Sequence, residues 1–232
     1  MSSQKNLLHS KDGIEYEIDD CVKIACDDCK GCQKCCENMA DTIVLDPYDV
    51  WQLTHKLKIS GGGTVSFEVL ISEDGPLELT PKNGLILPNM KMVETKKEGV
   101  GACSFLNNGR CSIHFCRPGI CRLYPLGRIF SEDSLKPTYF ILDEELGCPI
   151  KDTTEISVKE WIGIPDERYG AFQAKWNELK KRLQNAILSG EFSSEALRRI
   201  QIKLLELFFV KPYGDDFFKE FDERLNIWMN GV

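Results

Sequence analysis

The chain has 232 residues, with 29 basic and 36 acidic side chains and a formal net charge of −7. This length is enough to bury a substantial hydrophobic core, and the acidic balance disfavours a protein that tracks nucleic acid phosphates or adheres to anionic membrane. The sequence shows neither a bilayer-length apolar run nor a secretory signal pattern. We therefore expect a cytoplasmic protein that binds neither nucleic acid nor membrane.

Eleven cysteines, unevenly spaced, are the most informative feature of the chain. They are Cys21, Cys26, Cys29, Cys32, Cys35, Cys36, Cys103, Cys111, Cys116, Cys121 and Cys148. Cytoplasmic thiols are normally kept reduced, so the pattern predicts metal ligands or redox groups rather than disulfides. We expect an N-terminal extension over residues 1–20, a cysteine-cluster metal-binding domain over 21–150, and a helical segment over 151–232 packed on that domain.

The region between the two main cysteine groups, and the residues just after them, contain signals for regular structure. Asp46 directly before Pro47 predicts a helix start, and the apolar spacing that follows predicts a helix over 47–58. The glycines at 61–63 should end it. Short apolar runs predict the strands of one small antiparallel sheet, at Leu85–Leu87, Leu126–Phe130 and Thr138–Leu142.

Three amphipathic helices are predicted after Cys148, because apolar side chains there recur three and four residues apart. The stripes are Tyr169, Phe172, Trp176, Leu179, Leu183 and Ala186, then Leu197, Ile200, Leu204 and Phe208, then Phe218, Phe221, Leu225 and Trp228. We expect these aromatic side chains to be core. The predicted fold class is α+β, an irregular cysteine-rich metal-binding domain with short helices and a small antiparallel sheet, followed by a helical C-terminal segment.

The first cysteine group reads Cys29-Lys-Gly-Cys32-Gln-Lys-Cys35-Cys36 and places thiols three residues apart on a tight loop. Cys26 adds another CxxC step, and such density is a strong metal signal. Side chains of adjacent residues diverge in extended backbone, so Cys35 and Cys36 are expected to have different roles. They serve two neighbouring centres, or one is a ligand and the other is a packed or reserve thiol.

The second cysteine group contains a turn signal of its own. Asn107-Asn108-Gly109 can bring Cys103 and Cys111 together across a small hairpin. Two arginines, Arg117 and Arg122, flank Cys121. Their permanent charge either offsets an anionic thiolate centre or serves helix ends and surface acids.

Five motifs occur in order along the chain: Cys29-x-x-Cys32-x-x-Cys35-Cys36, Cys103-x-Phe-Leu, Gly109-x-Cys111, Arg117-Pro-x-x-Cys121-Arg-x-Tyr-Pro and Gly147-Cys148-Pro. Together they resemble the CxxCxxCC family of YkgJ-type cysteine-cluster proteins, described as zinc- or iron-chelating, which flagellin N-methylase also resembles. The resemblance covers roughly residues 26–150 and implies a metal-binding module with eight ligands, Cys29, Cys32, Cys35, Cys36, Cys103, Cys111, Cys121 and Cys148. Cys21, Cys26 and Cys116 lie outside the pattern as additional candidates, and His114 stands where the family often has an aromatic residue.

Ligands that are all thiolates suit zinc and iron–sulfur clusters alike. We favour an iron–sulfur cluster, of the 4Fe-4S type, with zinc as the alternative. The reason is that a compact CxxCxxC loop completed by a distant cysteine is a familiar way to hold four irons, and the chain has surplus thiols. Eight matched cysteines are enough for two centres.

Three functions are compatible with such a centre. A redox or electron-transfer protein, an iron–sulfur oxidoreductase included, is the first, and a structural zinc-binding interaction module is the second. Protein-lysine methyl transfer rests only on the flagellin N-methylase likeness, and a glycine-rich fingerprint for S-adenosylmethionine is absent from the sequence. The sequence assigns no catalytic residue and leaves open the substrate, the redox or protein partner and the oligomeric state.

Overall fold

The computed structural model describes residues 10–24, 33–39, 42–58, 62–95, 100–130, 136–143, 154–164 and 166–230. The chain divides into two compact units. Unit 1 consists of Met1–Ala40 and Met92–Gly170, and unit 2 of Asp41–Lys91 and Ala171–Val232. This division follows spatial contacts, whereas the predicted boundary at residue 150 follows the distribution of cysteines. Within the described ranges, no helix is long and apolar enough to cross a membrane.

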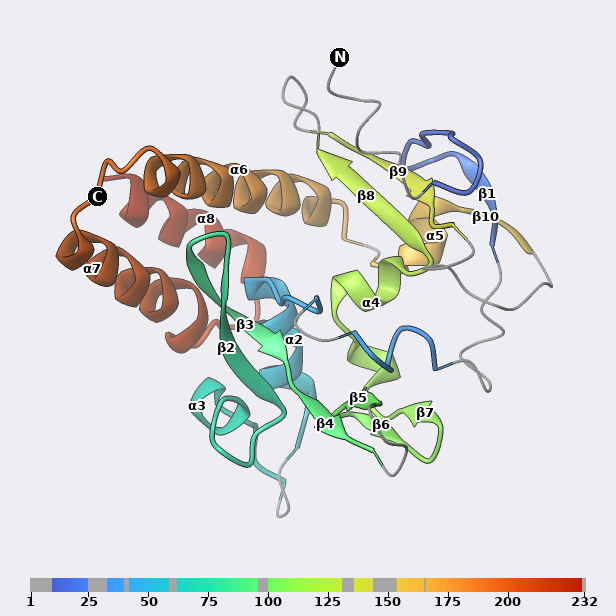
Figure 1. The fold of residues 1–232 in the computed structure, drawn as a ribbon, viewed down its shortest axis with the longest axis horizontal. Helices are drawn as coiled ribbons and strands as arrows, with labels where there is room; N and C mark the ends of the chain where they lie inside the picture. The colour runs from blue at the N-terminus through green and yellow to red at the C-terminus, as the bar shows by residue number, and fades with distance from the viewer. Residues whose placement is uncertain are drawn as a thin grey trace. The chain divides into compact units, whose positions relative to one another are not determined.

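Unit 1 is built from short antiparallel strand pairs and short helices, which confirms its share of the α+β class (Figure 1). The pairs are β1 (Cys21–Ile24) with β10 (Thr154–Ser157), β4 (Met92–Glu94) with β5 (Gly101–Cys103), β6 (Leu106–Asn107) with β7 (Arg110–Cys111), and β8 (Leu126–Phe130) with β9 (Pro137–Ile141). The helices are η2 (His114–Cys116), α4 (Gly119–Leu123) and α5 (Val158–Ile162). Isolated strand pairs have little stability, so unit 1 depends on contacts between these pieces.

Two contacts show how the pieces of unit 1 are held together. Trp161 Nε1 on α5 donates to the carbonyl oxygens of Leu123 and Tyr124, at 3.3 and 3.2 Å, and so ties α5 to the end of α4. Gly127 on β8 lies opposite Phe140 on β9, and a Cβ at position 127 would stand 2.2 Å from the Phe140 ring. The ring therefore occupies the space that any side chain at 127 needs.

The segment before β1 lies along β9 and extends the β8–β9 pair. The amide of Tyr16 donates to the carbonyl of Tyr139 at 2.7 Å, and the amide of Tyr139 donates back at 2.8 Å. The amide of Lys11 adds a bond to the carbonyl of Ile141 at 2.8 Å. Residues 11–20 are all exposed except Tyr16, which is half-buried. Backbone bonds therefore hold a segment that buries little of its own surface.

Unit 2 contains the longer helices and one hairpin. Its elements are α2 (Pro47–Lys56), α3 (Phe67–Leu70), β2 (Leu77–Lys82), β3 (Leu85–Met90), α6 (Arg168–Leu188, in unit 2 from Ala171), α7 (Ser194–Leu205), the π-helical turn η3 (Glu206–Val210) and α8 (Phe217–Met229). The three helices predicted after Cys148 are thus confirmed as α6, α7 and α8. The wide spacing of their apolar residues was a sufficient signal, because a stripe three and four residues apart forms one face only in a helix.

The helix predicted over 47–58 is confirmed as α2. The Asp46 carboxylate accepts the amide of Asp49 at 2.9 Å, and Asp49 returns a bond to the amide of Asp46 at 3.2 Å, which is a capping box. Pro47 occupies the first turn, where its missing N–H costs nothing. The helix ends at Lys56, two residues before the predicted end. Of the three glycines that were expected to stop it, Gly61 lies outside the described residues, and Gly62 and Gly63 follow the end of the helix.

Aromatic side chains form the core of unit 2, as the stripes predicted. Phe172 on α6 meets Phe221 and Phe217 on α8 edge to face, with ring centroids 4.7 and 5.1 Å apart. Trp176 and Phe208 are 2% and 0% exposed. Edge-to-face contact places the positive rim of one ring on the negative face of the next and adds to the gain from burial.

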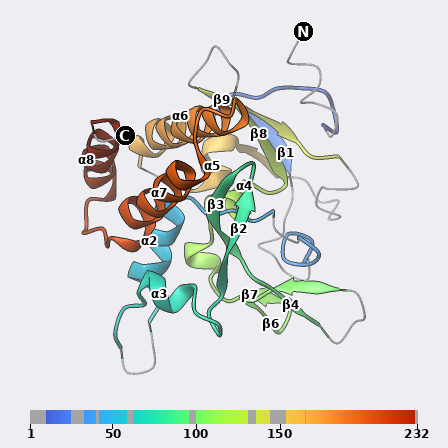
Figure 2. The same ribbon diagram turned by 60° about the vertical axis from the view of Figure 1, so that its left-hand side comes forward.

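The β2–β3 hairpin lies beside α7 (Figure 2). Gln201 on α7 donates to the carbonyl of Gly84 at 2.8 Å and accepts the amide of Ile86 at 3.0 Å. The predicted strand Leu85–Leu87 therefore exists, but it pairs with β2, and only Leu126–Phe130 and Thr138–Leu142 pair with each other. The prediction of one sheet from all three runs is wrong, because β2 contains Pro81 and Lys82 and gave no clear strand signal.

Arg224 on α8 is a buried charge, with 3% of its surface exposed. Its Nη1 donates to the carbonyls of Leu207 and Lys211 at 2.8 and 2.6 Å, and its Nη2 donates to the carbonyl of Pro212 at 2.6 Å. Its guanidinium carbon stands 3.4 Å from the centroid of the Tyr213 ring. Arg224 thus satisfies carbonyl groups left without helical partners where η3 ends.

Candidate metal centre

The described part of the first cysteine group forms a turn. The carbonyl of Gln33 accepts the amides of Cys36 and Glu37, at 2.8 and 2.9 Å, so the backbone folds back on itself at Cys35. Both cysteine side chains are half-buried, and their sulfur atoms lie 3.9 Å apart. The turn therefore brings two adjacent thiols to the same side of the chain.

This geometry differs from the one assumed for the vicinal pair, and the expectation that its two thiols have different roles stays a prediction. Divergence of Cys35 and Cys36 was predicted for extended backbone, and the premise is wrong because Gln33 closes a turn there. Two thiolates bound to one tetrahedral ion at about 2.3 Å lie about 3.8 Å from each other. The observed 3.9 Å is close to that separation, so the spacing of the two sulfurs is compatible with a shared ion.

The same segment continues as a partner of β5. The amide of Cys103 donates to the carbonyl of Cys36 at 2.7 Å, and the amide of Asn38 donates to the carbonyl of Gly101 at 2.8 Å. The Asn38 side chain returns a bond by accepting the amide of Gly101 at 3.1 Å. These bonds lock the vicinal pair beside Cys103. Sequence reasoning missed Asn38, whose φ of 56° in the left-handed region is one that Asn tolerates better than most residues.

The hairpin predicted around Asn107-Asn108-Gly109 is confirmed as β6–β7. Asn108 and Gly109 have φ values of 47° and 76°, the signs required by the two-residue turn that fits the twist of a hairpin. Cys111 pairs across it with Leu106. A Cβ on Gly109 would stand 3.0 Å from Nε2 of Gln33, so the turn also touches the segment that carries the vicinal pair.

The thiols of these segments raise one another's pKa values. The pKa of Cys36 is raised, first by its hydrogen bond with Cys35, then by burial and by the charges of Cys35, Cys111 and Cys103. Burial raises the pKa of Cys103 from 9.0 to about 11, with smaller contributions from Cys111 and Cys35. Cys35, Cys36, Cys103 and Cys111, hereafter the four-thiol group, therefore repel one another when ionised. A bound cation would remove that repulsion.

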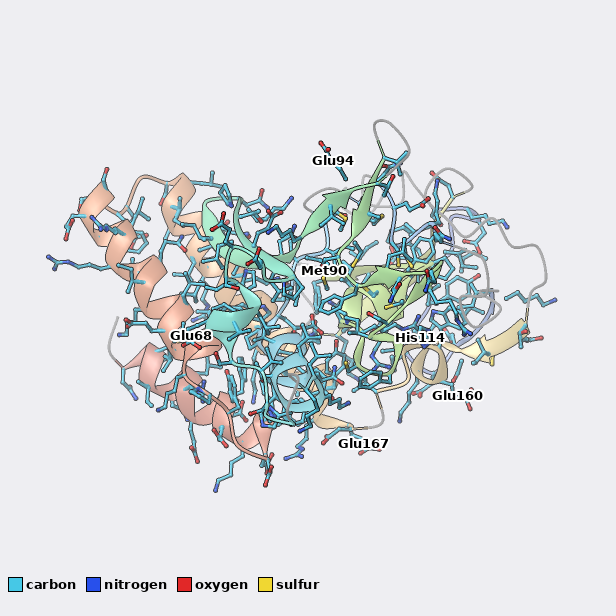
Figure 3. All side chains as sticks on the ribbon, turned by 90° about the horizontal axis from the view of Figure 1, so that it is seen from below. Glu68, Met90, Glu94, His114, Glu160 and Glu167 are labelled. Atoms are coloured by element: carbon cyan, nitrogen blue, oxygen red, sulfur yellow. The ribbon has the colours of Figure 1, made fainter. Side chains whose placement is uncertain are left out.

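The thiols of the four-thiol group lie in the same part of unit 1, but their side chains are not yet arranged to coordinate an ion. Among the described residues, no three His, Cys, Asp or Glu side chains stand close enough to hold an ion as they are. The vicinal pair is in place, and thiol side chains reorient by rotation about one bond. The residues present fit zinc or iron, since both ions take thiolate ligands in tetrahedral arrangement. Glu94 does not belong to the group, because Figure 3 shows it projecting away from the β4–β5 pair.

Cys116 and Cys121 lie on the next two elements of unit 1. Cys116 ends η2 and has no exposed surface, while Cys121 is half-buried on α4. Arg122 donates to the carbonyls of Arg117 and Phe115, at 3.0 and 3.2 Å. These bonds hold the guanidinium against backbone groups at the end of η2.

Other predicted ligands cannot be placed in the same way. Cys26, Cys29, Cys32 and Cys148 lie outside the described residues, so the expected meeting of all eight cysteines stays a prediction. Cys21 is exposed at the start of β1, and His114, labelled in Figure 3, begins η2. No disulfide joins any two described cysteines.

Comparison with known proteins agrees with this chemistry. Residues 28–149, more than half of the chain, match the CxxCxxCC family, whose description reads "Putative zinc- or iron-chelating domain". No curated protein and no solved structure matches the chain. The matched range contains the four-thiol group together with Cys29, Cys32, Cys116, Cys121 and Cys148, whereas Cys21 and Cys26 precede it. The resemblance seen in the motifs is confirmed, and the chain belongs to the CxxCxxCC family.

Proposed function

We propose that the chain chelates one zinc or iron ion through Cys35 and Cys36 and that Cys103 and Cys111 complete the coordination. The observation that carries this proposal is the 3.9 Å separation of the Cys35 and Cys36 sulfurs, the spacing of two ligands on one tetrahedral ion. Backbone bonds to Cys36 hold Cys103 beside the pair, and the tight turn at Gly109 presents Cys111.

The expected role of this ion is to tie together parts of unit 1 that are weak by themselves. The ligands come from the turn at residues 33–37, from β5 and from β7, all short pieces without a large core. Binding to four thiolates contributes on the order of 10 kcal/mol, as much as the whole folding free energy of many domains. A structural metal module, the alternative considered from the sequence, is therefore the function that the geometry supports best.

An iron–sulfur cluster with a redox role is the second candidate. It is supported by the spacing Cys29-x-x-Cys32-x-x-Cys35, which suits a four-iron cluster completed by a distant cysteine such as Cys148. Each iron of such a cluster takes one cysteine, and sulfurs on different irons lie farther apart than sulfurs that share an ion. The Cys35–Cys36 distance therefore favours a single ion at this pair over a cluster that uses Cys35. A reducing compartment such as the cytoplasm suits both centres.

Anaerobic purification followed by metal and acid-labile sulfide analysis tests the proposal. We expect Cys35→Ser and Cys36→Ser each to lose one equivalent of zinc or iron, because serine is a poor ligand for soft metal ions. When the native metal of the wild-type protein is removed and replaced by cobalt, the protein should show the intense visible absorption bands of tetrahedral thiolate coordination. Cys21→Ser, which changes an exposed thiol outside the family pattern, is the matched control and should keep the full metal content.

Two results would reject the single-ion centre. The first is full metal content in Cys36→Ser with normal folding. The second is iron accompanied by an equal amount of sulfide, all of it lost in either single variant. That second result would favour a cluster that uses the vicinal pair, and it would revive the redox function.

A further inference from the structure

The vicinal pair of Cys35 and Cys36 is suited to a second reaction besides metal binding. The two sulfurs lie 3.9 Å apart, and the turn closed by the Gln33 carbonyl holds both on the same side of the chain. Oxidation can join two thiols in that position, because a disulfide forms once rotation about the side-chain bonds brings the sulfurs to about 2 Å. The pair therefore has two accessible chemical states, the dithiol and the disulfide.

A small oxidant can reach both thiols of the pair. Cys35 and Cys36 are half-buried, whereas Cys103 on β5 is only 6% exposed. The backbone register places Cys103 across from Cys36, with the amide of Cys103 donating to the carbonyl of Cys36 at 2.7 Å. Of these three thiols, the vicinal pair is therefore the part that a molecule as small as hydrogen peroxide meets first.

Metal binding puts the pair in the form that reacts with such an oxidant. Ligands bind as thiolates, and the thiolate is the nucleophilic form of cysteine. We propose that the vicinal pair is a peroxide-sensitive switch, in which a Cys35–Cys36 disulfide forms and the bound ion is released, a regulation that rests on the metal site proposed above. The sulfurs of a disulfide carry no negative charge and are poor ligands, so only Cys103 and Cys111 are left to hold the ion.

The reaction consumes one molecule of peroxide and transfers two electrons. The Cys35 thiolate attacks one oxygen and breaks the O–O bond, which gives a sulfenic acid and a hydroxide. The Cys36 thiolate then attacks the sulfur of Cys35, which forms the S–S bond and displaces a second hydroxide. Both hydroxides take up a proton and leave as water. The electrons pass from sulfur to oxygen, and a zinc ion keeps its charge because zinc has no redox chemistry.

The adjacency of the two cysteines favours reversal of the switch. Neighbouring α-carbons lie about 3.8 Å apart, closer than the roughly 4.4–6.8 Å that disulfides usually span, so the ring closed between Cys35 and Cys36 is strained. A strained disulfide is reduced more easily than a structural one. The bonds that hold Cys103 and Asn38 against the segment at residues 33–37 do not involve the thiols, so the pair stays in place for rebinding.

The test treats the full-length, zinc-loaded protein with hydrogen peroxide and follows zinc with a chromophoric indicator. We expect about one zinc ion to be released per chain, in step with the loss of about two free thiols. A dithiol reductant such as dithiothreitol should restore the thiols and the bound zinc. Cys21→Ser, which removes an exposed thiol outside the proposed site, is the matched control and should release zinc at the wild-type rate.

Tryptic digestion after the free thiols are blocked identifies the disulfide. Cleavage after Lys34 and Lys56 gives a peptide of residues 35–56, whose only cysteines are the vicinal pair. Cys103 and Cys111 fall in two other peptides. We expect the 35–56 peptide of the oxidised protein to be lighter than the dithiol form by two hydrogen atoms, and reduction should return it to the dithiol mass.

Three results would overturn the switch. They are zinc that stays bound under peroxide, zinc that leaves while the 35–56 peptide keeps both free thiols, and a disulfide that joins Cys103 to Cys36 in place of the vicinal bond. A protein that binds neither zinc nor iron before oxidation would instead refute the proposed metal site, and the switch with it. The metal content measured before peroxide is added therefore separates the two kinds of failure.

Discussion

Metal affinity should rise steeply with pH, because the metal must displace protons from the four-thiol group. Burial raises the pKa of Cys103 to about 11, and the bond with Cys35 together with burial raises the pKa of Cys36. Both thiols are therefore protonated in the metal-free protein at neutral pH. As ligands they bind as thiolates, so each releases its proton when metal enters.

The size of the effect follows from the number of protons released. Each proton adds one unit to the slope of log Ka against pH, so Cys36 and Cys103 alone predict a slope of about two between about pH 6 and 8. The slope approaches about four when Cys35 and Cys111 are protonated as well. The pKa of Cys103, about 11, lies about four units above pH 7, so removing its proton at pH 7 costs roughly 5 kcal/mol and weakens metal binding by that amount.

Competition with a chromophoric chelator across this pH range measures the slope. Calorimetry in two buffers of different ionisation enthalpy counts the released protons independently. Cys103→Ser should lower the slope by about one, and Cys21→Ser should leave it unchanged. A wild-type slope below about one, or a slope unaffected by Cys103→Ser, would show that the protonated thiols of this group are not the metal ligands.

Two further predictions concern the packing of the units and are measured by urea unfolding. Gly127→Ala should lower the free energy of unfolding by about 1–3 kcal/mol, because its Cβ would overlap the Phe140 ring, whereas Gly170→Ala on α6, with no atom within 4 Å, should be neutral or stabilising. If both alanine variants cost the same, the ring does not fill the space at 127. Arg224→Met should cost about 3–5 kcal/mol, because it strands buried carbonyl groups, whereas Arg199→Met, which removes an exposed pair on α7, should cost less than about 0.5 kcal/mol. Equal costs for these two would mean that the carbonyl groups around Arg224 find water.

Short-range signals in the sequence were reliable here. The cap at Asp46, the Asn108-Gly109 turn and the apolar stripes after Cys148 all formed the predicted structures. Each signal depends on residues within a few positions of each other, where steric limits and local hydrogen bonds decide the conformation. The cysteine spacing likewise identified the family, because ligand chemistry restricts which residues can stand at those positions.

Strand pairing was not readable from the same information. Leu85–Leu87 was recognised as a strand but assigned to the wrong partner, since β2 carries a proline and a lysine that weaken its pattern. In two-stranded pairs the partner is chosen by contacts that packing makes available, here including Gln201 on α7. The pattern of apolar residues in β3 therefore does not specify which strand it pairs with.

The sequence by itself determined that this protein concentrates thiols for metal binding and ends in amphipathic helices. Only the tertiary structure decided that Cys35 and Cys36 lie on the same side of the chain, 3.9 Å apart. Their positions depend on the Gln33 carbonyl, which closes the turn, and on bonds from residues 36–38 to β5, more than sixty residues farther along the chain. Adjacent side chains diverge or converge according to backbone torsions, and long-range hydrogen bonds of this kind set those torsions without leaving a pattern in the local sequence.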